Sequence, residues 1–288
     1  MNLAPARRAV LMSAGAALLA PTARAADASP FAPLEARLKG GRLGVYAVDT
    51  ATGRTLTHRA AERFPMASSF KGLLAGAVLA RVDAGRERLE RRIAYSRADL
   101  LSHAPVAEAH VAEGALTVET LCQAAVEESD NTAANLLLRS LGGPAGLTAW
   151  LRAIGDPVTR LDRYELALNS ALPGDPRDTT TPAAMAATYG RLLLGSTLKP
   201  ASRQRLAAWM VEAKTGLNRL RKDLPAGWRA GDKTGTGRNG AIGDVAVLWP
   251  PKGGPILVAC YTHMGAAPLP VCEAVMAAVG RIVRESLA

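Results

Sequence analysis

The sequence predicts an α/β sandwich in which one antiparallel five-stranded sheet, built from both ends of the chain, lies beside an all-helical lobe. Strand-like alternation is confined to the two ends of the chain, and helical periodicity fills the middle. Of the 288 residues, 49% are apolar and 21% are charged, which is enough to bury a full core and unlike a disordered chain. Beyond the N-terminus, no apolar run reaches the roughly 18 residues that a membrane helix needs.

The first 25 residues have the pattern of a cleaved export signal, which we assign to residues 1–25. Arg7 and Arg8 precede an apolar run, Ala9–Ala20, and Ala23–Ala25 has the small-x-small pattern that signal peptidases cut after. We therefore expect a mature chain that begins near Ala26 and is periplasmic or secreted. The paired arginines are a feature of twin-arginine signals, but the residues that follow them do not match that motif well, so both export routes stay open.

The chain carries a formal net charge of +10, but its positive residues are scattered, without a block of five or six. This distribution indicates a solvated surface and not a nucleic-acid face. We expect no nucleic-acid partner, no membrane attachment after signal cleavage, and a monomer. The four histidines have no i,i+4 or clustered spacing, so we expect no metal site and no cofactor.

The predicted strands lie at both ends of the chain. Near the N-terminus, Leu43–Thr50 and Arg54–His58 form a hairpin around Thr52-Gly53. Near the C-terminus, three further strands are expected, at Trp228–Thr236, Ile242–Trp249 and Ile256–Thr262. Asn239-Gly240 is a hairpin signal between two of them. The match of Gly235–Gly240 to the dinucleotide motif G-x-G-x-x-G is therefore coincidental, because that motif must open a helix.

The middle of the chain reads as helices to about Leu220, beginning with one over Ser68–Ala84. Turns at Gly142–Pro144 and Pro173–Pro176 interrupt it, and a final helix is expected over about Val271–Ser286. We therefore divide the mature chain, residues 26–288, into two lobes. The α/β lobe covers about 26–65 and 212–288, and the helical lobe covers about 66–211.

The three cysteines leave at least one thiol free in an oxidising compartment. Cys122 lies in an apolar helical run, Val118–Val126, where a buried unpaired thiol is expected. Cys260 ends a predicted strand and Cys272 opens the final helix. A disulfide between these two and a pair of free thiols both remain open, because bond geometry cannot be read from sequence.

Three short motifs carry the candidate chemistry. Ser68-Ser69-Phe70-Lys71 places a serine in the first turn of the predicted helix, with a lysine three residues on that shares its face. The helix N-terminus would also favour an alkoxide at Ser68. Alone, S-x-x-K is expected about once by chance in a chain of this length. Ser129-Asp130-Asn131 and Lys233-Thr234-Gly235 follow in order, and each is expected by chance less than about 0.1 times.

With these three motifs the chain resembles a class A β-lactamase, a member of the serine penicillin-recognising enzymes, over essentially its whole mature length. The resemblance implies the β-lactamase/transpeptidase-like fold. It also extends to residues 163–169, which resemble the start of the family's Ω-loop. Glu165 matches the carboxylate that activates the hydrolytic water, and Asn169 matches that water's second ligand. Arg163 and Asp178 match the pair that closes the loop.

The resemblance implies hydrolysis of the amide bond of β-lactam antibiotics, and thus β-lactam resistance. Ser68 would form the acyl-enzyme, with Lys71 or Glu165 taking its proton, and Ser129 would pass a proton to the departing nitrogen. Backbone N–H groups of Ser68 and Thr236 would form the oxyanion hole. The remaining expected substrate contacts are Asn131 to the acylamino side chain, Lys233, Thr234, Gly235 and Thr236 on the K-T-G strand, Arg219, and His103.

Some residues depart from the commoner family pattern. Ile242 stands where many members carry an arginine, and Arg219 matches an alternative position from which a guanidinium reaches the same space; the alternative is a surface arginine. Ala67 and Gly237 replace the two cysteines of a carbapenem-hydrolysing subgroup, so that activity loses support. His103 falls where relatives place an aromatic gate, and either stacks on substrate or caps a loop.

Two other functions remain as alternatives. A D,D-peptidase (penicillin-binding protein) shares the three motifs, but peptidases of this superfamily lack the pair formed here by Glu165 and Asn169. A β-lactam-sensing domain acylates without turnover and is tethered to a membrane, whereas this chain shows only a cleavable signal. Multiple-turnover hydrolysis would distinguish the β-lactamase from both.

Overall fold

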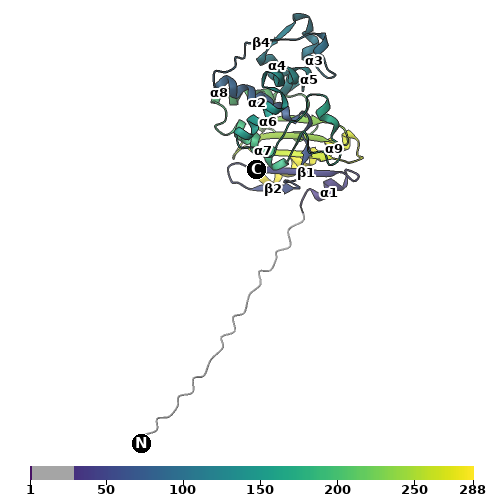
Figure 1. Cartoon of the computed structure of the whole chain (residues 1–288). Helices are drawn as coiled ribbons and strands as arrows, with labels where there is room; N and C mark the ends of the chain where they lie inside the picture. Colours follow the sequence, from purple (N-terminus) through teal and green to yellow (C-terminus); the bar gives the residue numbers. More distant parts are fainter. Residues whose placement is uncertain (2–28) are drawn as a thin grey trace.

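The computed structural model describes Met1 and residues 29–288, so the predicted export signal lies outside the described residues. Residues 2–28 are drawn as a grey trace in Figure 1. In the described part of the chain, no helix is long and apolar enough to cross a membrane.

The two ends of the chain form one antiparallel sheet, as the sequence predicted. Its strand order is β2-β1-β9-β8-β7. The chain ends meet where β1 pairs with β9 along their full lengths, for example Val45 opposite Cys260. The strands are β1 (Arg42–Asp49), β2 (Thr55–His58), β7 (Arg229–Thr236), β8 (Ile242–Trp249) and β9 (Ile256–His263). Asn239 and Gly240 turn between β7 and β8 with φ of 53° and 67°, the left-handed conformation expected of an Asn-Gly hairpin.

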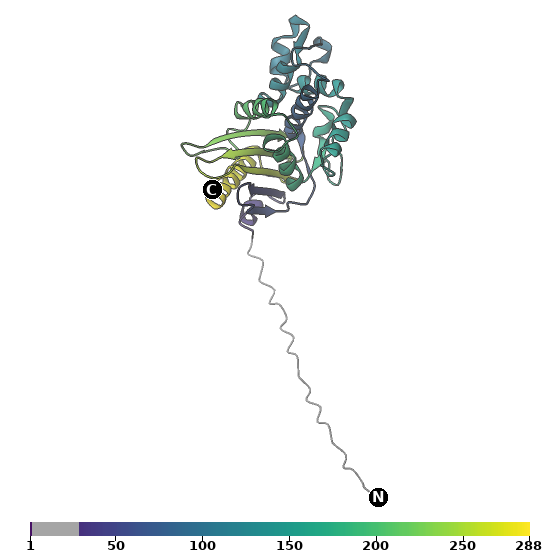
Figure 2. The ribbon, with the colours of Figure 1, turned by 90° about the vertical axis from the view of Figure 1, so that its left-hand side faces the viewer.

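Most helices lie between β2 and β7 in the sequence. The helices are α1 (Ala32–Ala36), α2 (Phe70–Asp83), α3 (Pro105–Ala109), α4 (Val118–Glu127), α5 (Asn131–Ser140), α6 (Gly143–Ala153), α7 (Pro182–Leu193), α8 (Pro200–Val211) and α9 (Leu269–Leu287). Several of them, including α3, α4 and α5, gather at the end of the molecule away from α1 and β2, whereas α7 lies on the sheet (Figures 1 and 2). Short strand pairs also occur: β3 (Phe64–Pro65) with β6 (Thr179–Thr180), and β4 (Arg92–Ala94) with β5 (Ala115–Thr117).

The sheet separates two hydrophobic cores. On one face α9 and α1 pack against side chains such as Val45 and Val258. On the other face the core continues from Val247 and Tyr261 into the helical part, where α2 is buried along Phe70–Leu79. The sequence division placed α7 in the helical lobe, but α7 packs directly on β1 and β9. Its buried residues, including Tyr189, seal the second face of the sheet.

Several predicted boundaries are corrected. The first long helix begins at Phe70, because residues 67–69 form a separate 3₁₀ turn. Gly143 and Pro144 belong to the first turn of α6, where proline is well tolerated. The last helix before β7 ends at Val211, and not near Leu220.

The three cysteines are buried, free thiols. Of the two alternatives for Cys260 and Cys272, a disulfide or two free thiols, the structure has the free thiols. Both pack in the core between the sheet and α9. The prediction of a buried, unpaired Cys122 is confirmed.

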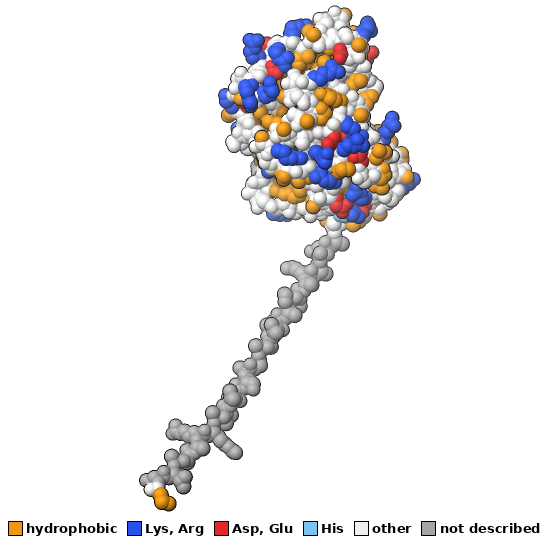
Figure 3. Space-filling model, viewed as in Figure 1, with side chains coloured by type: hydrophobic (Ala, Val, Ile, Leu, Met, Phe, Trp, Pro, Cys, Tyr) orange, Lys and Arg blue, Asp and Glu red, His pale blue; other side chains and the backbone are white. Residues whose placement is uncertain are grey.

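Charged side chains are spread over the face shown in Figure 3, where Lys and Arg lie interspersed with Asp and Glu. Ion pairs between exposed side chains of the described residues include Arg92 with Glu113 and Arg205 with Glu119. Such exposed pairs contribute little to stability, typically about 0–1 kcal/mol each.

Candidate active site

Ser68 lies in the 3₁₀ turn Ala67–Ser69 that leads into α2, and not in the first turn of α2 itself. The preceding residue, Ala67, has a φ of 41°, a conformation that non-glycine residues rarely adopt and that often marks functional sites. Ser69 fixes the turn, since its Oγ donates to the Met66 carbonyl at 2.7 Å and lies 2.9 Å from the Tyr261 hydroxyl. Of the two serines, Ser68 lines the neighbouring cavity.

Lys71 and Glu165 lie beside the Ser68 hydroxyl. The Ser68 Oγ donates to Glu165 Oε1 at 3.3 Å, and Lys71 Nζ lies 3.1 Å from the same oxygen. The side chains of Lys71 and Glu165 are fully buried. Burial lowers the pKa of Lys71, and the Glu165 charge opposes that change. Two groups that can accept a proton from Ser68 are therefore held together out of water.

Ser129 lies between two lysines. Lys71 Nζ donates to the Ser129 carbonyl at 2.7 Å and lies 3.4 Å from its Oγ, while Lys233 Nζ donates to that Oγ at 3.1 Å. Lys71 also donates to Asn131 Oδ1 at 2.6 Å. Burial lowers the pKa of Lys233 to about 7, and the nearby Lys71 charge acts in the same direction. The Ser129 hydroxyl can therefore exchange a proton with an ammonium on either side.

Asp130, between these two site residues, is fully buried and organises the backbone. Its carboxylate accepts the N–H groups of Val106 and Ala107 and caps α5 at Ala133. This side chain thus holds α3 and α5 together and fixes Ser129 and Asn131 on either side of it. The left-handed φ of Ser129, 59°, is part of this arrangement.

Glu165 and Asn169 form a direct pair. Asn169 Nδ2 donates to Glu165 Oε2 at 2.6 Å. The segment that carries them is closed by Asp178, which accepts the Arg163 Nε at 2.6 Å and the backbone N–H groups of Asp162 and Arg163. The expected closing pair is therefore in contact, with the Asp178 side chain only 1% exposed.

Asn135 also holds Glu165, and the sequence analysis did not identify it. Its Oδ1 accepts the Glu165 N–H at 3.0 Å, and its Nδ2 donates to the Glu165 carbonyl at 2.9 Å. The sequence feature that could have identified Asn135 is its position inside a helix, one turn after Asn131 and therefore on the same face. The peptide bond between Glu165 and Leu166 is cis.

The K-T-G strand runs close against the Ser68 turn. A Cβ added to Gly235 would lie 2.5 Å from the Met66 carbonyl oxygen and 3.1 Å from the Ser69 nitrogen. Only glycine allows β7 this approach, which brings Thr234 and Thr236 to the same cavity as Ser68. Thr234 Oγ1 lies 2.6 Å from Thr215 Oγ1, another cavity residue that the sequence analysis missed.

Arg219 is a buried cavity residue, so its alternative interpretation as a surface arginine is wrong. Its Nη1 donates to the carbonyls of Gly235 and Gly243 at 3.0 and 2.9 Å. Its Nη2 donates to Thr236 Oγ1 at 2.9 Å, and its Nε lies 3.3 Å from Glu273 Oε1. The guanidinium is thus fixed at the end of β7, beside Ile242 of β8.

These residues surround a cavity of about 470 Å³. Its lining residues are Ser68, His103, Ser129, Asn131, Leu166, Asn169, Thr215, Arg219, Thr234 and Thr236. Lys71, Glu165 and Lys233 lie buried behind this lining. His103 is exposed at the cavity, and its Nε2 lies 2.9 Å from the Glu128 carbonyl, which fits the loop-capping alternative.

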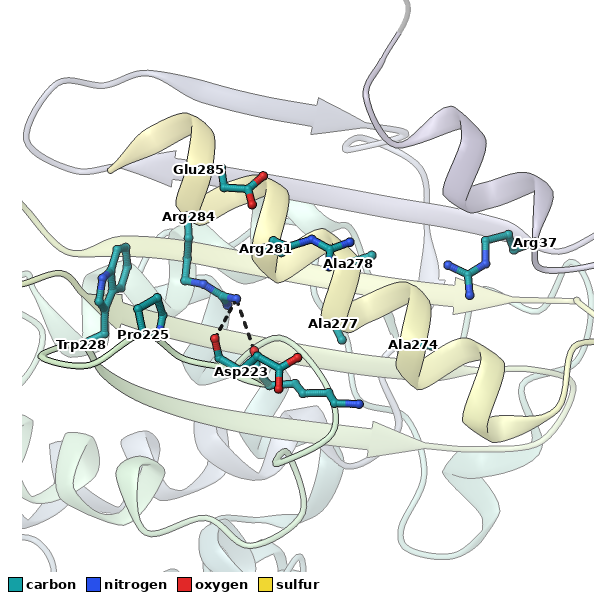
Figure 4. A pocket seen from close by; sticks show the side chains of 11 residues that line it. Arg37, Asp223, Pro225, Trp228, Ala274, Ala277, Ala278, Arg281, Arg284 and Glu285 are labelled. Carbon is teal, nitrogen blue, oxygen red and sulfur yellow. Dashed lines mark hydrogen bonds between the residues drawn. The ribbon is translucent and has the colours of Figure 1, made fainter.

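A somewhat larger cavity, about 530 Å³, lies between α9 and the segment before β7 (Figure 4). Trp228 and the buried Arg284 help to line it. Arg284 donates to the carbonyls of Leu220, Lys222 and Asp223. It thereby supports the backbone that follows Arg219, while the cavity itself contains no serine, cysteine or threonine nucleophile.

The chemistry available at the smaller cavity is nucleophilic catalysis: a hydroxyl beside buried proton acceptors, a second hydroxyl between two lysines, and a fixed guanidinium. A sequence model of the beta-lactamase enzyme family matches residues 31–287. Beta-lactamase AST-1 of Nocardia asteroides is 49% identical over 257 residues, covering 89% of this chain and 82% of that protein. The chain therefore belongs to the β-lactamase enzyme family, as a class A member.

Solved structures agree with this assignment. The class A β-lactamase of the last common ancestor of Gram-negative bacteria is 60% identical, with a TM-score of 0.87 over 90% of this chain and 98% of that one. The putative class A β-lactamase PenP from Rhodopseudomonas palustris is 52% identical, with a TM-score of 0.86 over 89% and 97% of the two chains. The expected fold is thus confirmed.

Proposed function

We propose that this class A β-lactamase hydrolyses the lactam amide through an acyl-enzyme on Ser68, which Glu165 and Asn169 then resolve with water. One observation carries the proposal: the Ser68 hydroxyl, the Lys71 ammonium and the Glu165 carboxylate meet in one buried cluster at the wall of the cavity. Ser129, the second serine that lines the cavity, contacts both lysines, but no carboxylate of the described residues bonds to its hydroxyl.

In the acylation step, Ser68 Oγ attacks the lactam carbonyl and its proton passes to the Glu165 carboxylate, or to Lys71 when Lys71 is the neutral amine. The contacts leave both routes open, because Glu165 Oε1 lies 3.3 Å from Ser68 Oγ and 3.1 Å from Lys71 Nζ. The C–N bond of the lactam then breaks, and the nitrogen takes a proton from Ser129. Lys233 or Lys71 can restore that proton, since both contact the Ser129 hydroxyl.

In the deacylation step, Glu165 takes a proton from water as that water attacks the acyl carbon. The bond between the acyl carbon and Ser68 Oγ then breaks, and Glu165, 3.3 Å from Ser68 Oγ, returns the proton to that oxygen. Asn169 suits the second water contact for a specific reason. Its Nδ2 is held by Glu165, while its Oδ1 is a buried acceptor to which no group of the described residues donates. That oxygen can accept from a water that donates its other proton to Glu165.

Substrate would be held mainly by charge and by hydrogen bonds from β7. Lys233, Thr234 and Arg219 suit the carboxylate of the antibiotic, with Gly235 providing the close approach of the strand. Backbone N–H groups of Ser68 and Thr236 suit the developing oxyanion. Asn131 can contact the acylamino side chain, although Lys71 and the Ser102 carbonyl already occupy both ends of its amide. His103 also lines the cavity.

The test compares two adjacent serines. Wild-type enzyme should hydrolyse a chromogenic cephalosporin over many turnovers, whereas a D,D-peptidase or a sensor would give at most about one product per molecule. Ser68→Ala should lose both turnover and covalent labelling by mass spectrometry. Ser69→Ala is the matched control, and should still be labelled. An acyl adduct on Ser68→Ala would place the nucleophile elsewhere.

We also propose that residues 1–25 are an export signal, so that the mature enzyme, from about Ala26, acts as a periplasmic or secreted monomer free of the membrane. This rests on the pattern around Arg7, Arg8 and Ala23–Ala25. The mature part would consist of the α/β lobe, about 26–65 and 212–288, and the helical lobe, about 66–211, of which α7 packs on the sheet. N-terminal sequencing of the exported enzyme tests the cleavage site, and sedimentation tests the monomer. Full-length protein in the cytoplasm would contradict the proposal.

A further inference from the structure

His263, the last residue of β9, is a buried histidine that contacts the segment carrying Glu165 and Asn169. It is 3% exposed. Its Nε2 lies 3.0 Å from the carbonyl oxygen of Ala171, and its Nδ1 lies 3.3 Å from Arg42 Nη2. Arg42 is its direct cross-strand neighbour on β1. The ring therefore bridges the edge of the sheet and the segment that follows Asn169.

The two partners define the state of the imidazole. A carbonyl oxygen can only accept, so Nε2 must carry the proton, and a guanidinium can only donate, so Nδ1 must be the acceptor. Burial lowers the pKa of His263, the hydrogen bond to Ala171 opposes that change in part, and the Arg42 charge acts in the same direction as burial. The ring is thus a neutral Nε2–H tautomer, and its donor points at the Ala171 carbonyl.

The Ala171 carbonyl ends the turn that carries Asn169. Residues 167–170 form a 3₁₀ turn, and Ala171 leaves it with a left-handed φ of 46°. The β7–β8 hairpin holds the same stretch, since Arg238 N–H donates to the Asn169 carbonyl at 2.9 Å. Asn239 Nδ2 contacts the carbonyls of Ser170 and Ala171 at 3.1 and 3.2 Å, but Asn239 is exposed. Among these side-chain contacts, His263 supplies the buried one.

We propose that His263 is a positioning residue for hydrolysis of the acyl-enzyme, because its neutral ring fixes the end of the 167–170 turn and so the placement of Asn169 beside Glu165. It acts through Ala171 and does not touch the reacting atoms. The inference rests on the proposed roles of Glu165 and Asn169. Ser68, Lys71 and Ser129 lie on other segments, so acylation should depend on His263 much less than deacylation does.

The test measures the two chemical steps separately. His263→Leu removes the donor, and a net hydrogen bond of typical strength corresponds to a deacylation rate lower by roughly 2- to 13-fold. The acylation rate should stay within about twofold, so rapid-quench mass spectrometry with a penicillin should show a larger acyl-enzyme fraction in the steady state. His263→Gln keeps an amide donor and should recover much of the deacylation rate.

A merely structural role would behave differently. Loss of folded enzyme lowers both steps equally once rates are referred to active sites. Ser202→Ala is the control, because it removes the side-chain hydrogen bond of another buried residue, from Ser202 to Asp83 at 2.7 Å, far from Ala171 in the chain. Its balance of acylation and deacylation should equal that of the wild type. Equal losses in both steps for His263→Leu, or none, would overturn the proposal.

A measurement on the unaltered enzyme covers the case in which the leucine variant fails to fold. Nitrogen-15 NMR should show His263 as the Nε2–H tautomer at neutral pH, and an Nδ1–H tautomer would contradict the proposal. Glu165→Ala distinguishes a failure of the His263 proposal from a failure of the proposed function on which it rests. If Glu165→Ala does not strand the acyl group, the proposed function fails. If it does, and His263→Leu deacylates normally, only the role of His263 fails.

Discussion

Replacing Arg219 by alanine tests how this enzyme binds the substrate carboxylate. A guanidinium has five N–H donors. Four are committed in the structure: Nη1 to the carbonyls of Gly235 and Gly243, Nη2 to Thr236 Oγ1, and Nε towards Glu273. One Nη2 donor remains for substrate, in addition to the positive charge. Since Ile242 offers neither, nothing on the neighbouring strand can replace Arg219.

One charge-assisted hydrogen bond is worth about 1.5–3 kcal/mol, so kcat/KM for penicillins should fall roughly 10- to 150-fold in Arg219→Ala. KM should rise more than kcat changes, because the carboxylate is bound alike in the ground and transition states. The melting temperature should also fall, since each buried carbonyl left without its donor costs about 1–3 kcal/mol. Steady-state kinetics and thermal unfolding measure the two effects separately.

Arg229→Ala is the matched control for charge. It removes an exposed arginine from the other end of β7, where the guanidinium stacks on Trp249 with 4.2 Å to the ring centroid. Its kcat/KM should remain within about twofold of the wild type. Unchanged kinetics in Arg219→Ala, with only a lower melting temperature, would refute a role in binding and leave Arg219 as a structural support for β7 and β8.

Three other predictions concern pH, packing and thiols. Since the folded-state pKa of Lys233 is lowered to about 7, the ammonium is lost as pH rises through that value, and kcat/KM, which reports the free enzyme, should decline above it in a pH–rate profile. Gly235→Ala should reduce acylation strongly in a burst assay, because the new Cβ meets the Met66 carbonyl at 2.5 Å; wild-type bursts would show that β7 shifts freely. A thiol reagent should modify almost no cysteine in the native enzyme and three after denaturation. A single reactive thiol after denaturation would instead indicate a Cys260–Cys272 disulfide.

Local rules predicted the sheet and its turns well. Alternation gave all five strands to within a residue or two, and Asn239-Gly240 formed the hairpin that its backbone preferences require. The position of α7 could not be predicted in this way. Its sequence is that of an amphipathic helix, and whether the apolar side meets other helices or the sheet depends on contacts distant in the chain.

The site residues that belong to short sequence motifs could be predicted. Single residues that contact one another from distant parts of the chain could be predicted less well. The Asn135 side chain holds the backbone N–H and carbonyl of Glu165, 30 residues away in the chain. No local sequence pattern predicts that these two residues are in contact. Ser68 was placed in the first turn of a helix because helical periodicity begins there. The close contact of β7, which only Gly235 permits, lies against the 3₁₀ turn that actually carries Ser68.

Acylation of Ser68 and release of the acyl group by Glu165 can both be followed in the intact mass of Glu165→Ala after mixing with a penicillin. General-base catalysis is typically worth about 10²–10⁴, so deacylation should slow by at least that factor, while Lys71 remains in place to assist acylation. We expect a stoichiometric adduct on Ser68 that persists for many wild-type turnover times. Wild-type turnover without an accumulated adduct would contradict this expectation.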